Sequence, residues 1–576
     1  MADSTARLFL STVTADFDAA RDAALGPWCF AGAERVYEEW ENLPFFDPFE
    51  NAAVYAEHAR NVGDLAMIQA DRLGRRLNAR HGTSYDRHHW RLILVPWLSA
   101  LIQASWIRFA HLQKFIRANG NRAFTVEVCD DLNPWAFRDT EDFVDFGVPN
   151  PGFNAWMLSV MVRRLAPDTW RLVPIQAQHR EAPPSPAGGE QRGWKRDLLP
   201  DRLSVDNVPG LRWGKLLFSV YVNCLPRRRG GEPAYEPDPG SCLSAFPDVY
   251  LEILDRLVAA TEPCSYGQDF AILDNQAKEK RYRPGRLLVG FVELFNERER
   301  FIAAHARSNG ERLVIVQHGG GYGAKKCDPD GNNFEYRQFA FVTWGWTEVE
   351  GSRGRFVPLP APHLSRIRNR HRRTTNDLVL VGTQMQLFPR WLHAGPQSVQ
   401  TLAYRREKIG FVEALAEPAR QRLRYRPYFR SEVDLEDEQF LRRQVGDLDL
   451  VTGDLHRHLL NCRMAVIDHP ITTLPVALAA NVPTVAFWDD TIWPRSPQAA
   501  ASLEVLADCG ILHRSGRSAG AQVNAVWDDV ESWWRDRPVQ RARQQWCHQY
   551  ARTHPFWWAF WLAGLWRLAS AHGRRP

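Results

Sequence analysis

Cysteine is sparse in this chain of 576 residues, and its nine cysteines are scattered. No two are close enough to form a CxxC pair, and their number is odd. The sequence therefore favours neither a zinc site nor a disulfide framework. Reduced thiols are typical of the cytoplasm, which is the compartment we predict. The cysteines are Cys29, Cys129, Cys224, Cys242, Cys264, Cys327, Cys462, Cys509 and Cys547.

Long apolar runs are also lacking. None reaches the ~18 residues of a membrane-spanning helix, and serine and threonine interrupt the N-terminus before Asp16, so we expect no secretory signal. Two shorter runs stand out, at 92–107 and 556–566. The first contains Pro96 and Gln103 and predicts a buried core helix. The second is rich in tryptophan and precedes a basic tail. We expect it to dock on another domain, with a membrane interface as the alternative.

The common catalytic signatures are missing as well. HExxH, GxSxG, paired carboxylates and clustered metal ligands are not found, so we predict no required metal and no cofactor. A net charge of +5 is too mild to indicate nucleic acid. The arginine-rich segment 351–376 lacks the interleaved aromatic residues that stack on bases. We therefore expect no nucleic-acid partner and interpret this segment as a solvated linker.

What the chain does contain is the pattern of an α/β protein. Residues 30–125 show helical spacing of apolar residues. A buried strand at 286–294, a helix ending at Asn309-Gly310 and a second strand at 312–317 form a βαβ unit, which implies a parallel sheet. Strands at 377–383, 463–469 and 482–488, with a helix at Leu474–Ala480, repeat the pattern. Two stretches rich in proline and glycine, 183–200 and 226–240, read as loops.

These patterns predict two α/β domains facing a cleft, with a helical elaboration at the N-terminus. We expect an acceptor-side domain over 1–350 and a basic linker over 351–375. A donor-binding domain over 376–540 and a C-terminal aromatic helix over 541–576 follow. Ligands of such sheets bind at the carboxyl ends of the strands.

The most informative segment is 317–323, QHGGGYG, which directly follows a buried strand. A histidine at the end of a strand is exposed to the cleft, and its pKa near ~6.5 lets it take a proton at neutral pH. We therefore select His318 as a general base. Gly319, Gly320 and Gly321 would allow a ligand to approach the backbone closely. The alternative is a tight turn with a structural histidine. The motif is neither a Walker A loop nor GxGxxG.

A second segment, 468–475, has the sequence DHPITTLP. A strand ends at Asp468, and Thr472 and Thr473 precede a helix. We select Asp468, His469, Thr472 and Thr473 as candidates for donor binding. Amides at a helix N-terminus together with hydroxyl groups form a phosphate site, whereas a simple cap would need only one threonine. Arg426, in the segment RYRPY, is a weaker candidate for a diphosphate ligand. The remaining candidates are Tyr322 and Glu335 for substrate binding, and Gly382, Thr383 and the helix-stop residue Asn481 for donor binding.

These motifs resemble a family of transferases found in bacterial surface-polysaccharide and O-antigen biosynthesis loci. The matching pieces are 77–98, QHGGGYG at 317–323, FVTWGW at 341–346 and DHPITTLPVALAANVPTVAFW at 468–488. The last pattern is shared with GT-B type glycosyltransferases and polyol-phosphate transferases. The resemblance implies two Rossmann-like domains, the C-terminal one holding an activated nucleotide donor, and His318 on the acceptor side. It also implies metal-independent chemistry and a final helix, from about Gln540, that crosses back to the first domain.

One position departs from this pattern. Related sequences usually carry a glutamate a few residues after the threonine pair, where this chain has Val476. Valine cannot accept a hydrogen bond from a ribose hydroxyl, so the ribose must be recognised elsewhere, the donor has changed, or activity has been lost.

The main hypothesis is a cytoplasmic glycosyltransferase of surface-polysaccharide or lipopolysaccharide O-antigen assembly. Its partners would be a nucleotide-sugar donor and a saccharide or lipid-linked saccharide acceptor, with peripheral contact to the inner membrane. The alternatives are a polyol-phosphate transferase, a nucleotide-sugar epimerase or hydrolase on the same fold, and a non-catalytic scaffold that binds a nucleotide sugar.

Overall fold

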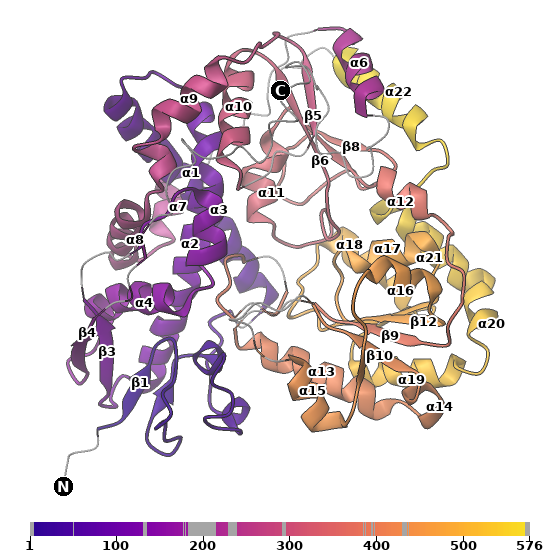
Figure 1. The fold of residues 1–576 in the computed structure, drawn as a ribbon, viewed down its shortest axis with the longest axis horizontal. Helices are drawn as coiled ribbons and strands as arrows, with labels where there is room; N and C mark the ends of the chain where they lie inside the picture. Colours follow the sequence, from indigo (N-terminus) through magenta and orange to yellow (C-terminus); the bar gives the residue numbers. More distant parts are fainter. Residues whose placement is uncertain are drawn as a thin grey trace.

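A computed structural model describes most of the chain. It contains three β-sheets in which every strand pair is parallel, surrounded by helices, so the predicted α/β class is confirmed (Figure 1). The loop predicted at 183–200 and residues 228–238 of the loop predicted at 226–240 lie outside the described residues. The structure describes residues 5–49, 51–130, 135–176, 178, 180–181, 215–227, 239–290, 295–383, 385, 387–392, 395–396, 398–428, 435 and 437–570.

The N-terminal sheet was not predicted, and its strands lie almost wholly outside residues 30–125, the stretch that was expected to be helical. Its strands, in the order β2-β1-β3-β4, have two to five residues, and β4 is largely exposed, so they lack the apolar runs that mark buried strands. The strands are β1 (Arg7–Phe9), β2 (Ala23–Ala24), β3 (Thr125–Cys129) and β4 (Arg171–Ile175).

Two long consecutive helices, joined by residues 82–86, form the centre of the N-terminal region. In α1 (Ala52–His81), Asn51 caps the first turn, and Gly82 ends the helix with a φ of 65°. The helix α2 (Arg87–Asn119) is apolar enough in part to cross a membrane, but that part is entirely buried in the protein. The prediction of a buried core helix is thus confirmed. Further helices here are α3 (Thr140–Asp142), α4 (Pro151–Leu165), α7 (Pro239–Ser244), α8 (Asp248–Thr261) and α9 (Phe270–Lys278).

The middle sheet has the order β5-β6-β7-β8, with α10 (Glu297–Ser308) between its first two strands as predicted. The apolar residues on one face of this sheet form a core with α6 (Lys215–Cys224) and α22 (Trp557–Ser570), which lie side by side in Figure 1. The other elements are β5 (Leu287–Gly290), β6 (Arg312–Val316), α11 (Pro329–Asn333), β7 (Ala340–Thr343) and β8 (Phe356–Pro358).

The segment 351–375 is more ordered than a linker. It supplies β8, which pairs with β7, and α12 (Pro362–Ile367), whose Leu364 is fully buried. Residues 351–355, 359–361 and 368–377 lack helix and strand. The many arginines hid these short elements, because long charged side chains can cover apolar surface while their ends remain in water.

The C-terminal sheet has six strands in the order β11-β10-β9-β12-β13-β14, and its predicted central strands are confirmed. In β9, Leu378 and Leu380 face a core with α13 (Gln400–Ala414), α15 (Asp437–Val445) and α19 (Gly516–Val526), whereas Val379 and Val381 face the opposite core with α17 (Thr473–Ala480). Burial on both faces explains why these strands read as continuous apolar runs. The strands are β9 (Leu378–Val381), β10 (Leu423–Arg426), β11 (Asp449–Leu450), β12 (Met464–Ile467), β13 (Thr484–Phe487) and β14 (Leu512–His513).

The helices of the C-terminal region cover both faces of this sheet (Figure 1). They are α13 (Gln400–Ala414), α14 (Glu417–Arg420), α15 (Asp437–Val445), α16 (Leu455–Asn461), α17 (Thr473–Ala480), α18 (Pro497–Ala507), α19 (Gly516–Val526), α20 (Val530–Arg535) and α21 (Arg537–Tyr550).

The middle and C-terminal sheets meet where their strands end. Lys325 and Arg495 form an antiparallel bridge, and two backbone hydrogen bonds flank it, each 3.0 Å long: Lys326 N–H to Pro494 O, and Ser496 N–H to Ala324 O. We call this contact, together with the loop after β6, the junction. It brings the two most informative sequence motifs together.

Candidate functional site

The loop after β6 is anchored by Gln317, whose side chain is 1% exposed. Its Oε1 accepts from the Trp344 backbone N–H at 2.8 Å and from Trp346 Nε1 at 2.9 Å. Its Nε2 donates to Gly319 O at 2.8 Å. The TWGW motif therefore holds the QHGGGYG loop in place, which gives both motifs a structural reason to occur together.

The glycines of this loop are required by close packing. A methyl group on Gly320 would lie 2.8 Å from backbone atoms of Ile471 and Thr472, and one on Gly323 would lie 2.5 Å from the Trp346 ring. Gly323 also has a φ of +73°, and Gly321 one of +88°. At these points the protein's own backbone and an indole ring make the close approach that we expected of a ligand.

His318 lies at the exposed edge of the loop, with 34% of its side chain exposed. Its Nε2 lies 2.5 Å from Tyr322 Oη and 3.5 Å from Glu335 Oε1. Tyr322 in turn donates to Glu335 Oε1 at 3.3 Å, and Glu335 is almost fully buried. Burial, together with the Glu335 carboxylate, raises the pKa of Tyr322 well above its usual value, so the phenol keeps its proton. An exposed imidazole backed by a buried carboxylate can accept a proton from a bound group.

A chain of hydrogen bonds runs from the end of β9 to the start of α17. The Thr383 N–H donates to Tyr404 Oη at 2.9 Å, and Tyr404 donates to Asp468 Oδ2 at 2.7 Å. Asp468 Oδ1 lies 2.8 Å from His469 Nδ1, and His469 Nε2 lies 3.1 Å from Thr473 Oγ1. Asp468 and His469 are only 1% and 2% exposed. They therefore position Thr473 rather than face solvent.

Thr472 joins the two motifs. It precedes α17 but makes no side-chain cap bond within the helix. Its Oγ1 instead accepts the Gly320 N–H at 3.0 Å. The departure at Val476 is one turn further along α17, and this side chain is 4% exposed, packed in the core.

The other predicted donor residues lie at different distances from the junction. Gly382 directly follows β9 and Arg426 ends β10, and the Gly382 N–H donates to Arg426 O at 3.0 Å. Two strand spacings separate β10 from β12, or about 10 Å. Arg426 Nη1 donates to Pro427 O at 2.8 Å. Asn481 lies at the far end of α17, where a φ of 64° ends the helix as predicted and Trp534 Nε1 donates to its Oδ1.

Two residues at this site, Tyr404 and Arg495, were not predicted from the sequence. Arg495 follows β13, its side chain is 8% exposed, and its Nη2 is buried with no hydrogen-bond partner in the described residues. Its guanidinium lies 4.6 Å from the Trp488 ring, and burial lowers its pKa to about 9. It lines a cavity of about 10 Å³ together with Gly321, Tyr322 and Leu474, which has room for one water at most. No sequence pattern marked either residue.

Two larger hollows are present, and the first of them borders the junction at Lys326. One, of about 220 Å³, includes Arg60, Lys326, Asp328 and Tyr336, and Tyr336 donates to Asp328 Oδ2 at 3.3 Å. Another, of about 480 Å³, lies between the α9 region and Phe295–Arg298.

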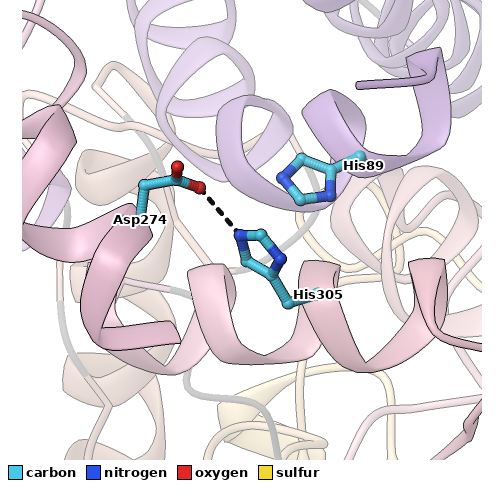
Figure 2. A group of neighbouring side chains, drawn as sticks. All are labelled: His89, Asp274 and His305. Atoms are coloured by element: carbon cyan, nitrogen blue, oxygen red, sulfur yellow. Dashed lines mark hydrogen bonds and ion pairs between the residues drawn. The ribbon is translucent and has the colours of Figure 1, made fainter. Parts of the chain in front are cut away.

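Figure 2 shows a group of side chains that could hold a metal, His89, Asp274 and His305, whose possible ligand atoms lie within 4.8 Å of one another. The Asp274 carboxylate is already bound, however. His305 Nε2 lies 2.7 Å from its Oδ1, Tyr85 donates to it at 2.8 Å, and Lys278 forms an ion pair at 2.7 Å. The Lys278 ammonium group beside Asp274 would repel a metal cation. These three side chains therefore fit a hydrogen-bonded contact between helices better than a metal site.

A family model described as "LIC12162 family transferase" matches residues 6–199 and 239–565, which is most of the chain and includes both motifs of the junction. A search of curated proteins found no match. The chain therefore belongs to the LIC12162 family of transferases.

Proposed function

We propose that this transferase moves a sugar from an activated nucleotide donor to a saccharide or lipid-linked saccharide acceptor in bacterial cell-surface polysaccharide assembly. The observation that carries the proposal is the hydrogen bond from Gly320 N–H to Thr472 Oγ1. It links an exposed histidine at the end of one parallel sheet to a helix N-terminus at the end of another. Two Rossmann-like domains of GT-B type would provide this arrangement, and the resemblance of the motifs supports that fold.

The donor diphosphate would bind at the start of α17. Backbone N–H groups at a helix N-terminus, together with its dipole, favour anions. Thr473 is held there by His469 at 3.1 Å, so its hydroxyl is oriented before a ligand arrives. Gly382, Thr383 and Arg426 lie at the carboxyl ends of the neighbouring strands, where the rest of the nucleotide would extend.

The acceptor would react beside His318. Its imidazole would take the proton of the acceptor hydroxyl, while the oxygen attacks the anomeric carbon and the bond from that carbon to the phosphate oxygen breaks. The nucleoside diphosphate leaves with the bonding electrons, and its charge is stabilised by amides and arginine. The Glu335 carboxylate, 3.5 Å from His318 Nε2, would stabilise the imidazolium that forms.

Transfer of a polyol phosphate, or epimerisation or hydrolysis of a nucleotide sugar, would use the same site, and product analysis separates these reactions. A non-catalytic sugar-nucleotide scaffold is the third alternative. It is favoured by one observation, the buried Val476 at the position where related sequences carry glutamate. Cytoplasmic location and independence from metals and cofactors remain predictions.

The first test is a thermal-shift screen against nucleotides and nucleotide sugars, without and with Mg²⁺. A ligand at 100 times its Kd adds about 2.7 kcal/mol of stability, which is easily detected. The proposal expects a stabilising ligand whose effect is lost in the Thr472→Ala/Thr473→Ala variant. Thr169→Ala, at an exposed threonine near the N-terminal sheet, is the matched control and should respond as the parent does. No response across the panel would contradict a nucleotide donor.

A further inference from the structure

The helices α6 and α22 gather most of the large apolar side chains that the described part of the molecule exposes. Ten such side chains are exposed there, and six of them are on α6 or on α22 and the residue before it. These six are Leu217 at 77%, Val220 at 55%, Phe556 at 61%, Trp558 at 48%, Phe560 at 37% and Trp566 at 52%. Scattered single residues would need no explanation, but a cluster of this kind marks an interaction site.

The two helices are fixed to the protein by their inner faces. Trp561 is 1% exposed, donates from Nε1 to Pro360 O at 2.9 Å, and packs with Leu565 into the core of the middle sheet. The ring centroids of Phe218 in α6 and of Trp561 lie 6.3 Å apart, and Tyr221 Oη donates to Leu562 O at 2.8 Å. The exposed residues therefore sit on a rigid platform and are not a loose tail.

The outer faces of both helices are apolar too. In α22 the residues Phe560, Ala563 and Trp566 follow helical spacing on the side opposite to Trp561 and Leu565. In α6 the exposed residues Leu217, Val220 and Cys224 form a similar stripe. A helix that is apolar all round is normally buried in a protein or in lipid. We call this surface the α6/α22 face.

Charge indicates what would cover it. Residues 215–227 and 551–570 contain no aspartate or glutamate, and they include Lys215, Arg227, Arg552 and Arg567. Arg227 and Arg567 are exposed. Two helical segments that combine exposed tryptophan and phenylalanine with basic residues, and that themselves contain no acidic residue, match the headgroup region of an anionic bilayer, where aromatic rings and basic side chains both concentrate. A self-association surface would not need this one-sided charge.

We propose that the α6/α22 face binds the surface of an anionic lipid bilayer. The α22 helix has 14 residues, about 21 Å, which is shorter than the ~30 Å hydrocarbon core, so it would lie in the interface and not cross it. The inner faces would stay on the middle sheet while Phe560 and Trp566 enter the acyl boundary. This proposal does not depend on the reaction proposed above.

The test is flotation of the full chain with two kinds of vesicle, phosphatidylcholine alone and equal parts phosphatidylcholine and phosphatidylglycerol. We expect binding to the second kind only, weakened by salt. The Phe560→Ser/Trp566→Ser variant should lower the partition coefficient at least about tenfold, because two large apolar side chains no longer enter the interface. Arg567→Gln should lower it about fivefold. Phe146→Ser is the matched control, since Phe146 is 59% exposed in a different part of the molecule, and it should bind as the parent does.

Three results would overturn the proposal. The first is no binding of the parent to either vesicle. The second is equal binding of the parent and of the Phe560→Ser/Trp566→Ser variant when both show the same near-ultraviolet circular dichroism. The third is a concentration-dependent dimer, seen by light scattering, that the double substitution abolishes while vesicle binding is unchanged, because a second copy would then be the occupant.

Discussion

Two histidines stand at the ends of parallel strands in this molecule, and each has a carboxylate and a hydroxyl beside it. His318 has Glu335 and Tyr322, and its side chain is 34% exposed. His469 has Asp468 and Thr473, and only 3% of its side chain is exposed. The same three chemical groups therefore occur twice, across one junction, in an open and in a closed form.

The comparison teaches that the groups alone do not assign a role. A proton can pass between His318 and a bound substrate, because the ring reaches the surface. The two ring nitrogens of His469 contact Asp468 and Thr473, so His469 would affect a ligand through the Thr473 hydroxyl that it orients. We therefore interpret His318 as the candidate base and His469 as a positioning residue. The same substitution at the two sites should give opposite results.

His318→Ala should have the largest effect, on turnover. Loss of a general base typically costs about 10²- to 10⁴-fold in rate. Donor affinity and thermal stability should change little, because the substitution leaves the Tyr322–Glu335 hydrogen bond and the start of α17 in place. Rates and donor Kd measured on the same preparation check this. An equal loss of turnover and donor binding would contradict the base assignment.

His469→Ala should act mainly on stability. It leaves the Asp468 carboxylate buried with Tyr404 as its remaining side-chain donor, at a cost of about 3 kcal/mol in the free energy of unfolding. Donor affinity should fall as well, since Thr473 loses its partner. Urea unfolding measures the first effect, with His318→Ala as the control that should lose far less. If both variants lose the same stability, the distinction between the two histidines is wrong.

Gly320→Ala tests the close contact between the loop that carries His318 and the start of α17. The added methyl group would lie 2.8 Å from the backbone of Thr472, so the loop or the helix start has to move, costing about 1–3 kcal/mol. Gly319→Ala is the matched control, because its methyl group would meet only Thr472 Oγ1 at 3.3 Å. Melting temperatures of the two variants give the result, and a Gly319→Ala change as large as that of Gly320→Ala would count against the close contact.

Acidification should lower the stability of the folded protein through its buried histidines. Burial lowers the pKa of His89 and of His111 to about 3, from the usual 6.5. The unfolded chain therefore binds more protons than the folded one between pH 3 and 6.5, and stability should fall as the pH drops below 6.5, by at most about 1.4 kcal/mol per unit per histidine.

The His111→Phe variant tests this. It retains an aromatic ring beside Trp28 and cannot be protonated, so its stability deficit relative to the parent should shrink as the pH falls. Urea midpoints of the two proteins across this pH range are the measurement. Parallel curves would mean that His111 contributes nothing to acid sensitivity.

The sequence predicted those parts of the fold that have a local sequence signal. The fully buried strands β6, β9, β12 and β13 read as apolar runs, and the end of α17 was visible in Asn481, the type of residue that adopts a positive φ. The N-terminal sheet and β8 escaped because their strands are short and partly exposed.

The candidate site was foreseen as two separate motifs. Their contact was not, because the hydrogen bond from Gly320 to Thr472 joins positions 152 residues apart. Tyr404 and Arg495 were missed for the same reason: nothing near them in the sequence distinguishes a tyrosine or an arginine that completes a distant hydrogen-bonded chain or lines a small cavity. The glycines were noticed, but their neighbours turned out to be Thr472 and Trp346.

The junction also has a consequence for the rate of the proposed reaction. Gly320, Ala324 and Lys326 are hydrogen-bonded across it, and the cavity beside Arg495 has room for one water at most. A phosphate group is larger than this cavity, so a donor phosphate that binds at the start of α17 and extends to Arg495 would need the junction to open, on the microsecond-to-millisecond scale of loop and domain motions. Each catalytic cycle would then include one opening and one closing event, and the slower of these would set an upper limit on the number of products made per second.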